Sequence, residues 1–310
     1  MWKLLRRITA LLSALSACLS ISASARDKPP VTIAQPQPAA VSENVAYPAL
    51  WKVGNAHTTI YLFGTIHALP KGIEWYGGPV ASAFESSNEL VTEITESSPE
   101  QMRALIVSRA MLPRGETLRM MLTPEVTSEY EKALTGMGMP AQAFDAFEPW
   151  YAAIGLSTLP LVRQGYTGEN GVEATLDTKA KVLGHPHTAL ETAEYQIGLF
   201  DSLPLDLQKR YFTDVVTNLP QATTMLAQMV EAWRKGDAET LAGLMNADED
   251  DPALIELLLI NRNRNWAGWI EDRLKRPGKV FLAVGAGHLA GPGSVQEQLA
   301  KRGIISTRVQ

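Results

Sequence analysis

The sequence of 310 residues contains a single cysteine, Cys18. One cysteine excludes an intramolecular disulfide framework, a zinc site with cysteine ligands and a C-x-x-C redox motif. Histidine is also scarce, with five residues in the whole chain. Any imidazole chemistry must therefore draw on this small set: His57, His67, His185, His187 and His288.

The chain also lacks a block of basic residues. Lys and Arg total 28 against 33 Asp and Glu, which gives a formal charge of −5 at pH 7. Nucleic-acid binding requires clustered Lys and Arg to neutralise phosphates, so we expect no nucleic-acid partner. The hydrophobic fraction of 45% is that of an ordinary globular protein. The oligomeric state does not follow from these features.

The N-terminal segment 1–25 has the pattern of a secretory signal peptide. A positively charged start precedes an apolar stretch, and an A-x-A cleavage site ends at Ala25. The apolar run is too short and too rich in serine for a membrane span. In the alternative, the Leu-Ser-Ala-Cys run is a lipobox, and a lipid on Cys18 anchors the protein to the membrane. Because the residues after Cys18 stay apolar, we favour cleavage after Ala25. Either route predicts an exported protein, which is periplasmic after cleavage at Ala25 and anchored to the membrane in the alternative.

Residues 26–48 are rich in proline and alanine and predict an extended tether. We expect one folded domain over 49–310. Apolar runs alternate there with helical patterns, which predicts an α/β fold: a central, mostly parallel or mixed sheet wrapped by helices, with a helical insertion at about 99–165. The predicted strands are 50–53, 59–63, 89–94, 187–190, 279–284 and 304–309. The main predicted helices are 78–87, 171–183, 205–234, 252–275 and 294–301, with a further short helix that starts at 237.

Two of the predicted strands run directly into a G-x-x-H motif, which ends at His67 in the first and at His288 in the second. In open α/β sheets, ligands bind beyond the carboxyl ends of the strands. Two further strands end in an acid, Glu93 and Glu191. Two histidines and a glutamate suit a divalent metal with an open position. Without a metal, a His–Glu pair can serve as a general base and its orienting partner.

Structural roles are also open for these residues. One G-x-x-H motif alone is a weak signal, and the two acids could instead favour helix N-termini. His57 is expected in a solvated turn, and His185 and His187 in a surface loop. Arg262 could bind a carboxylate, or it could lie on a helix face beside a packed tryptophan.

The order and spacing of several short motifs resemble the TraB/GumN family, which includes the TIKI-type proteases, over about 50–309. The resemblance implies a fold like that of the erythromycin-esterase/ChaN group. It also implies active-site roles for His67, Glu93 and His288. TIKI-type members use manganese or cobalt rather than zinc, whereas erythromycin-esterase relatives hydrolyse with His and Glu and no metal. The matching motifs lie at 50–53, 62–67, 90–93, 148–150, 171–173, 190–192, 196, 262–263 and 285–291.

The sequence therefore predicts a secreted hydrolase. The favoured hypothesis is a divalent-metal-dependent peptidase that acts on a peptide or protein. His67, Glu93 and His288 would hold the metal, and Glu191 would be a further ligand or the base. Arg262 would stabilise the oxyanion or the substrate carboxylate. Two alternatives stay open: a metal-free His/Glu esterase, and a non-catalytic module that binds a peptide, haem or a polysaccharide fragment.

Overall fold

The structure, a computed structural model, describes residues 44–246 and 252–310. The predicted signal peptide, with Cys18, and residues 26–43 of the predicted tether lie outside the described residues. Val45 pairs with Glu74 in an isolated β-bridge, and the Asn44 carbonyl accepts from the Glu74 amide at 2.9 Å. The last residues of the predicted tether therefore lie against the folded domain.

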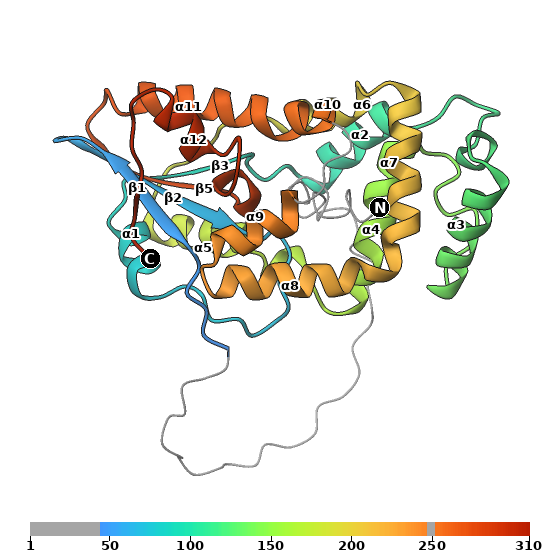
Figure 1. Cartoon of the computed structure of the whole chain (residues 1–310), viewed down its shortest axis with the longest axis horizontal. Helices are drawn as coiled ribbons and strands as arrows, with labels where there is room; N and C mark the ends of the chain where they lie inside the picture. The colour runs from blue at the N-terminus through green and yellow to red at the C-terminus, as the bar shows by residue number, and fades with distance from the viewer. Residues whose placement is uncertain (1–43, 247–251) are drawn as a thin grey trace, which may run out of the picture.

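In the described part of the chain, six strands form one mixed sheet, in the order β4-β3-β5-β2-β1-β6 (Figure 1). β2, β5, β3 and β4 run parallel, whereas β1 is antiparallel to β2 and β6 is antiparallel to β1. The parallel strands end at one edge of the sheet, so the residues that follow them meet there. The predicted α/β class with a mixed sheet is confirmed. The strands are β1 (Leu50–Gly54), β2 (Thr58–Thr65), β3 (Glu89–Thr92), β4 (His187–Ala189), β5 (Gly278–Gly285) and β6 (Thr307–Arg308).

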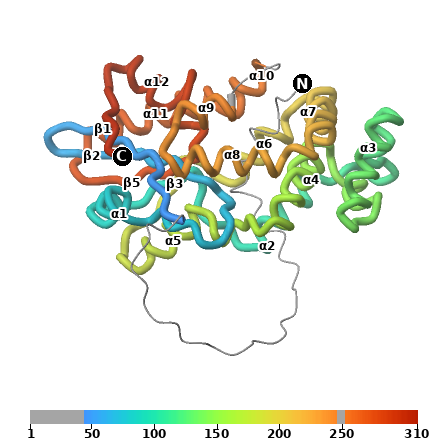
Figure 2. Tube along the Cα trace, turned by 60° about the horizontal axis from the view of Figure 1, so that its bottom comes forward, coloured from blue at the N-terminus to red at the C-terminus, as the bar shows by residue number. Residues whose placement is uncertain are grey.

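Helices cover both faces of the sheet: α1 and α5 lie on one face, α11 and α12 on the other (Figures 1 and 2). A helical layer that includes α2, α3, α4 and α7 extends beyond the carboxyl ends of the parallel strands. In the described residues, no helix is long and apolar enough to cross a membrane. The helices are α1 (Gly78–Glu85), α2 (Pro99–Ala110), α3 (Pro124–Gly136), α4 (Pro149–Arg163), α5 (Val172–Leu183), α6 (Ala193–Asp201), α7 (Leu205–Asn218), α8 (Ala222–Arg234), α9 (Ala238–Asn246), α10 (Pro252–Ile255), α11 (Asn261–Arg273) and α12 (Val295–Ala300).

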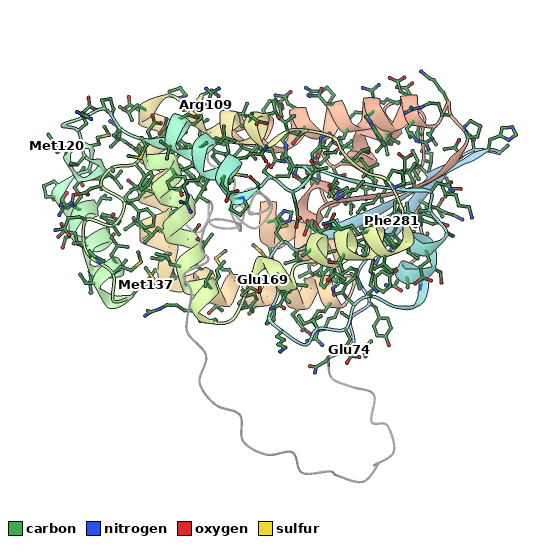
Figure 3. The ribbon with its side chains drawn as sticks, turned by 180° about the vertical axis from the view of Figure 1, so that it is seen from behind. Glu74, Arg109, Met120, Met137, Glu169 and Phe281 are labelled. Carbon is green, nitrogen blue, oxygen red and sulfur yellow. The ribbon has the colours of Figure 1, made fainter. Side chains whose placement is uncertain are left out.

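The core lies on both sides of β5, the central strand. Its residues 280–284 are at most 1% exposed, because β2 and β3 flank it and helices cover both faces. Successive side chains alternate between the faces. Phe281 packs against Phe84 of α1, with ring centroids 5.2 Å apart (Figure 3). Leu282 belongs to the opposite cluster, which includes Trp266 of α11.

The structure corrects several predicted elements. The predicted helix 205–234 is interrupted at Pro220, which lacks the amide hydrogen that a continuous helix needs. The predicted last strand shrinks to β6, which pairs with β1 through two residues only. The predicted helix 252–275 contains a π-helical turn at Glu256–Ile260. α6 was not predicted. Its N-terminal cap is visible in the sequence as Thr192, whose hydroxyl accepts a hydrogen bond from the Tyr195 amide at 3.1 Å.

Candidate functional site

Two acids lie side by side at the ends of β3 and β4. The parallel pairing continues past the strands, because the Glu191 amide donates to the Glu93 carbonyl at 2.8 Å. The Gln196 side-chain amide on α6 then donates to both carboxylates, at 2.9 Å each. The two strand-end acids of the sequence prediction are thus brought together.

Arg262 on α11 joins these two acids. Its Nη2 lies 2.5 Å from Glu93 Oε2 and 2.8 Å from Glu191 Oε2, and its Nε donates to Glu191 at 3.0 Å. Its Nη1 faces the Leu258 carbonyl at 3.2 Å and His288 Nε2 at 3.1 Å. A guanidinium has five N–H donors, and these contacts engage all of them. In this arrangement Arg262 has no donor left for an oxyanion or a substrate carboxylate.

The chain before Arg262 has an unusual helical geometry. The π-helical turn Glu256–Ile260 inserts one residue relative to a regular α-helix, and such turns are frequent at functional sites. Leu258, within this turn, supplies the carbonyl that accepts from Arg262. The arginine side chain is 0% exposed. The cation is therefore buried together with the acids that neutralise it.

His288 is held in one tautomer. The Asn263 side-chain amide donates to the Gly293 carbonyl at 2.8 Å, which leaves its Oδ1 to accept from His288 Nδ1 at 2.6 Å. His288 Nε2 consequently carries the lone pair and accepts from Arg262. Burial first, and then the positive charge of Arg262, lower the pKa of His288 to about 3. The ring is neutral at physiological pH.

Glu93 is ionised despite complete burial. Burial alone would raise its pKa, but the charge of Arg262, with smaller effects of His288, His67 and the Gly285 amide, lowers the pKa to about 2. The Gly285 amide donates to Glu93 Oε1 at 2.7 Å. Both histidines of the G-x-x-H motifs thus act electrostatically on one carboxylate at the strand ends.

His67 lies on the other side of this cluster, where α5 covers the sheet. β2 and β5 pair with Thr65 opposite Gly285, so the two motifs are offset by one residue. Beyond the strands, His67 contacts α5, whereas His288 lies in a 3₁₀ turn and contacts α11. His67 Nδ1 lies 2.5 Å from Glu173 Oε1 in the first turn of α5. Thr65 donates its hydroxyl to the same oxygen. The residues of the sequence that matched the family include Glu173, but its contact with His67 was not predicted.

The second oxygen of the Glu173 carboxylate is unusual. Glu173 Oε2 is buried and has no hydrogen-bond partner among the described residues. A buried carboxylate oxygen is costly to leave unpaired, and such atoms in native proteins are often connected with function. One oxygen of Glu173 therefore contacts His67, and the other can still accept a hydrogen bond.

The start of α5 lies unusually close to His67. The Val172 amide donates to the Ile66 carbonyl at 3.2 Å. A Cβ atom added to Gly171 would lie 2.1 Å from the His67 carbonyl oxygen, a distance that real Cβ atoms do not show. Only glycine permits this approach, which brings Glu173 within reach of the imidazole.

We expect the Gly171→Ala substitution to destabilise the protein by about 1–3 kcal/mol, because backbone atoms on both sides must move apart. Urea denaturation at equilibrium measures this change. Gly198→Ala in α6 is the matched control, since a Cβ there meets no atom within 4 Å. Equal stability of the two variants would contradict the close approach.

The predicted metal set does not fit a divalent cation in this arrangement. Both ring nitrogens of His288 have protein partners, and the Arg262 cation contacts Glu93 and His288 directly. In the two described ranges, no group of three or more His, Cys, Asp or Glu side chains could hold a metal ion. The metal stays a prediction from the sequence.

The other histidines lie apart from this cluster. His57 is exposed in the β1–β2 turn, as predicted. His185 is half-buried against Phe84, with ring centroids 5.6 Å apart. His187 begins β4, as the predicted strand 187–190 has it, and is bonded through both ring nitrogens, so the expectation of a surface loop is wrong for this residue.

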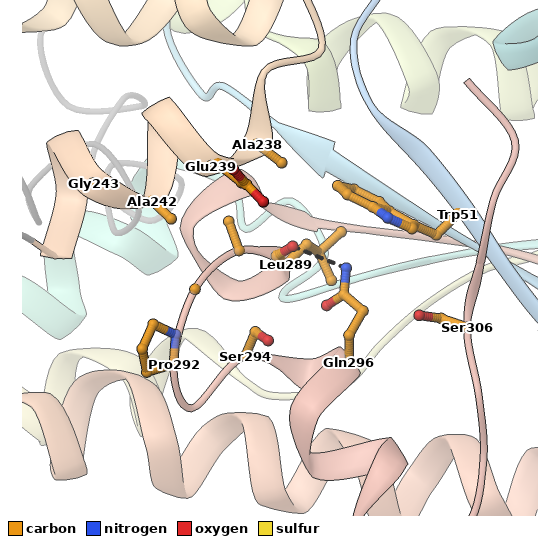
Figure 4. A pocket seen from close by; sticks show the side chains of 12 residues that line it. Trp51, Ala238, Glu239, Ala242, Gly243, Leu289, Pro292, Ser294, Gln296 and Ser306 are labelled. Atoms are coloured by element: carbon orange, nitrogen blue, oxygen red, sulfur yellow. Dashed lines mark hydrogen bonds between the residues drawn. The ribbon is translucent and has the colours of Figure 1, made fainter.

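A cavity of about 590 Å³ lies beside the loop that follows the second motif. Figure 4 shows Trp51, Glu239, Leu289 and Gln296 around it, with the Gln296 amide donating to the Leu289 carbonyl. His288 does not line this cavity, because its ring points to Asn263 and Arg262 on the opposite side of the loop.

Comparison with known proteins gives a family and distant relatives. The uncharacterized protein YbaP of Escherichia coli K12 is 25% identical over 248 residues, which cover 79% of this chain and 89% of YbaP. YbaP of Shigella flexneri matches to the same extent. An uncharacterized protein of Treponema pallidum is 22% identical over 275 residues, 82% of this chain and 81% of that protein. No solved structure gives a significant match. The model of the TraB/PrgY/gumN family matches residues 49–308, so the chain belongs to this family.

Proposed function

We propose that the protein is an exported hydrolase in which His67 is the general base and Glu173 holds its ring. The observation that carries the proposal is the 2.5 Å contact between His67 Nδ1 and Glu173 Oε1. Because an ionised carboxylate only accepts, Nδ1 bears the proton and Nε2 keeps the lone pair. Imidazole removes a proton from water in this tautomer.

The reaction we propose is hydrolysis of an ester or amide bond. His67 takes a proton from water, and the water oxygen attacks the substrate carbonyl carbon. Glu173 stabilises the imidazolium that forms, which then returns the proton to the departing alcohol or amine. General-base catalysis of this kind contributes roughly 10²- to 10⁴-fold.

The buried cluster of Glu93, Glu191, Arg262 and His288 has a supporting part in this proposal. Its side chains are at most 7% exposed, and the one cation, Arg262, bridges both carboxylates. Such a cluster keeps the ends of β3, β4 and β5 in fixed positions beside His67.

Metal-dependent peptide hydrolysis is the second candidate, because His67, His288 and Glu93 share one electrostatic environment. In that case Arg262 would have to leave His288 before a metal could bind. A peptide or protein substrate fits either candidate. The two differ in their response to chelation.

The test is hydrolysis of a panel of chromogenic esters and peptides by the purified protein, with and without EDTA. We expect turnover that EDTA does not reduce and that His67→Gln lowers by roughly 10²-fold or more. His57→Gln is the control, since His57 is exposed in a turn. Loss of activity in EDTA with recovery in Mn²⁺ would favour the metallopeptidase. Stoichiometric binding without turnover would identify a binding module instead.

A further inference from the structure

A third histidine, His187, connects the elements that carry the candidate site residues. His187 Nδ1 lies 2.9 Å from Asp177 Oδ1 on α5, and His187 Nε2 lies 2.7 Å from Thr92 Oγ1 at the end of β3. Thr92 is 2% exposed and Asp177 is 8% exposed. The link is therefore largely shielded from water, where hydrogen bonds constrain geometry most strongly.

These three residues have the outward form of a hydroxyl–imidazole–carboxylate triad, but their hydrogen bonds do not suit a nucleophile. The Thr92 hydroxyl donates its single proton to the Ile94 carbonyl at 2.8 Å. With that proton on the Ile94 carbonyl, Thr92 has none to give to the imidazole, so the hydroxyl is not placed as a nucleophile that His187 would activate.

Each end of this link is next to a residue of the candidate site. Thr92 directly precedes Glu93, and Asp177 lies one helical turn after Glu173 on α5. The start of α5 is already fixed by the Val172 amide on the Ile66 carbonyl. A second fixed point one turn further along defines both the direction and the rotation of the helix, and hence the position of the Glu173 side chain.

We propose that His187 is a positioning residue that fixes Glu173 relative to His67 by connecting α5 to the end of β3. The inference rests on the proposed role of the His67–Glu173 pair. Asp177 has one further partner, Lys181 on the same helix, which also faces Glu96 at 3.7 Å. Lys181 contacts neither β3 nor β4 in these ion pairs, so it offers a control that changes the charge around Asp177 and leaves the link intact.

The experiment is NMR of the protein with ¹⁵N-labelled histidine, in which five imidazoles are few enough to assign. In the unmodified protein we expect His67 to show a single tautomer with the proton on Nδ1. Asp177→Ala and His187→Phe should give averaged tautomers of His67. Asp177→Asn keeps an acceptor oxygen and should retain the pattern, as should Lys181→Met. Thermal unfolding confirms that each variant is folded.

Activity gives a second readout, on any ester or peptide of the panel that the unmodified protein hydrolyses. We expect Asp177→Ala to lower kcat roughly tenfold or more with little change in KM, and Asp177→Asn to restore most of it. An unchanged His67 spectrum in both Asp177→Ala and His187→Phe would overturn the positioning role. Because the NMR measurement needs no substrate, it stays decisive if the proposed hydrolysis is not found. Conversely, disturbed His67 signals in a protein without turnover would support the link and reject the hydrolase.

Discussion

Arg262→Met is expected to destabilise the protein by about 3–5 kcal/mol, the loss typical of breaking a buried ion pair by removal of one partner. The substitution leaves Glu93 and Glu191 buried, adjacent and without their cation. It also removes the donor to His288 Nε2. The free energy of unfolding from urea titration measures the effect, with the unmodified protein as reference.

A matched control exists elsewhere in the fold. Arg119 also bridges two acids, Asp145 and Glu131, but its side chain is 28% exposed. Arg119→Met should therefore cost only about 1 kcal/mol or less. The triple variant Arg262→Met, Glu93→Gln, Glu191→Gln should recover part of the loss, since no unpaired charge remains. Equal losses for the Arg262 and Arg119 variants would show that the buried cluster is not neutralised as described.

Acidification is the second large expected effect. The pKa of His288 is about 3 in the folded protein, against 6.5 for an ordinary histidine side chain, so the unfolded chain binds more protons between these values. Stability attributable to His288 is present above pH 6.5 and is lost as the pH falls toward 3. Glu93 acts in the same direction: its pKa is about 2 against 4.5, so its contribution is lost as the pH falls from 4.5 toward 2.

The expected curve of stability against pH therefore has two parts. Between pH 6.5 and 4.5 the slope reflects His288, on the order of 1 kcal/mol per pH unit, and below 4.5 Glu93 steepens it. Urea midpoints measured from pH 7.5 downward give the curve. His288→Gln should flatten the upper part and leave the Glu93 part in place. A flat curve for the unmodified protein between pH 6.5 and 4.5 would contradict the buried neutral His288.

Much of the fold follows from local sequence. The strand 279–284 could be predicted because it is a continuous apolar run that Pro277 and Gly278 bound, and the structure makes it the centre of the sheet. The strand-end acids Glu93 and Glu191 also follow from local patterns, because parallel strands end together. Their meeting requires only that β3 and β4 are neighbours.

The partners of the two histidines could not be predicted, because they depend on tertiary geometry. The two motifs are offset by one residue in the pairing of β2 and β5, and only the second of them enters a 3₁₀ turn; His67 contacts α5 and His288 contacts α11. No local pattern encodes that offset. The His67–Glu173 contact further depends on how closely a helix approaches a strand end, which the sequence signals only through Gly171.

The π-helical turn before Arg262 has a consequence for the whole helix that follows. Along α10, the turn and α11, buried residues recur at every fourth position: Leu254, Leu258, Arg262, Trp266 and Ile270. In a regular α-helix each step of four residues advances about 40° beyond a full turn, so this series would wind through about 160°. The residue inserted at the π-helical turn reduces that rotation by about 100°, the angle that one residue spans in an α-helix. Because of this extra residue, side chains spaced four apart lie on nearly the same face of the helix. The Arg262 guanidinium therefore faces the sheet together with the apolar residues of that face.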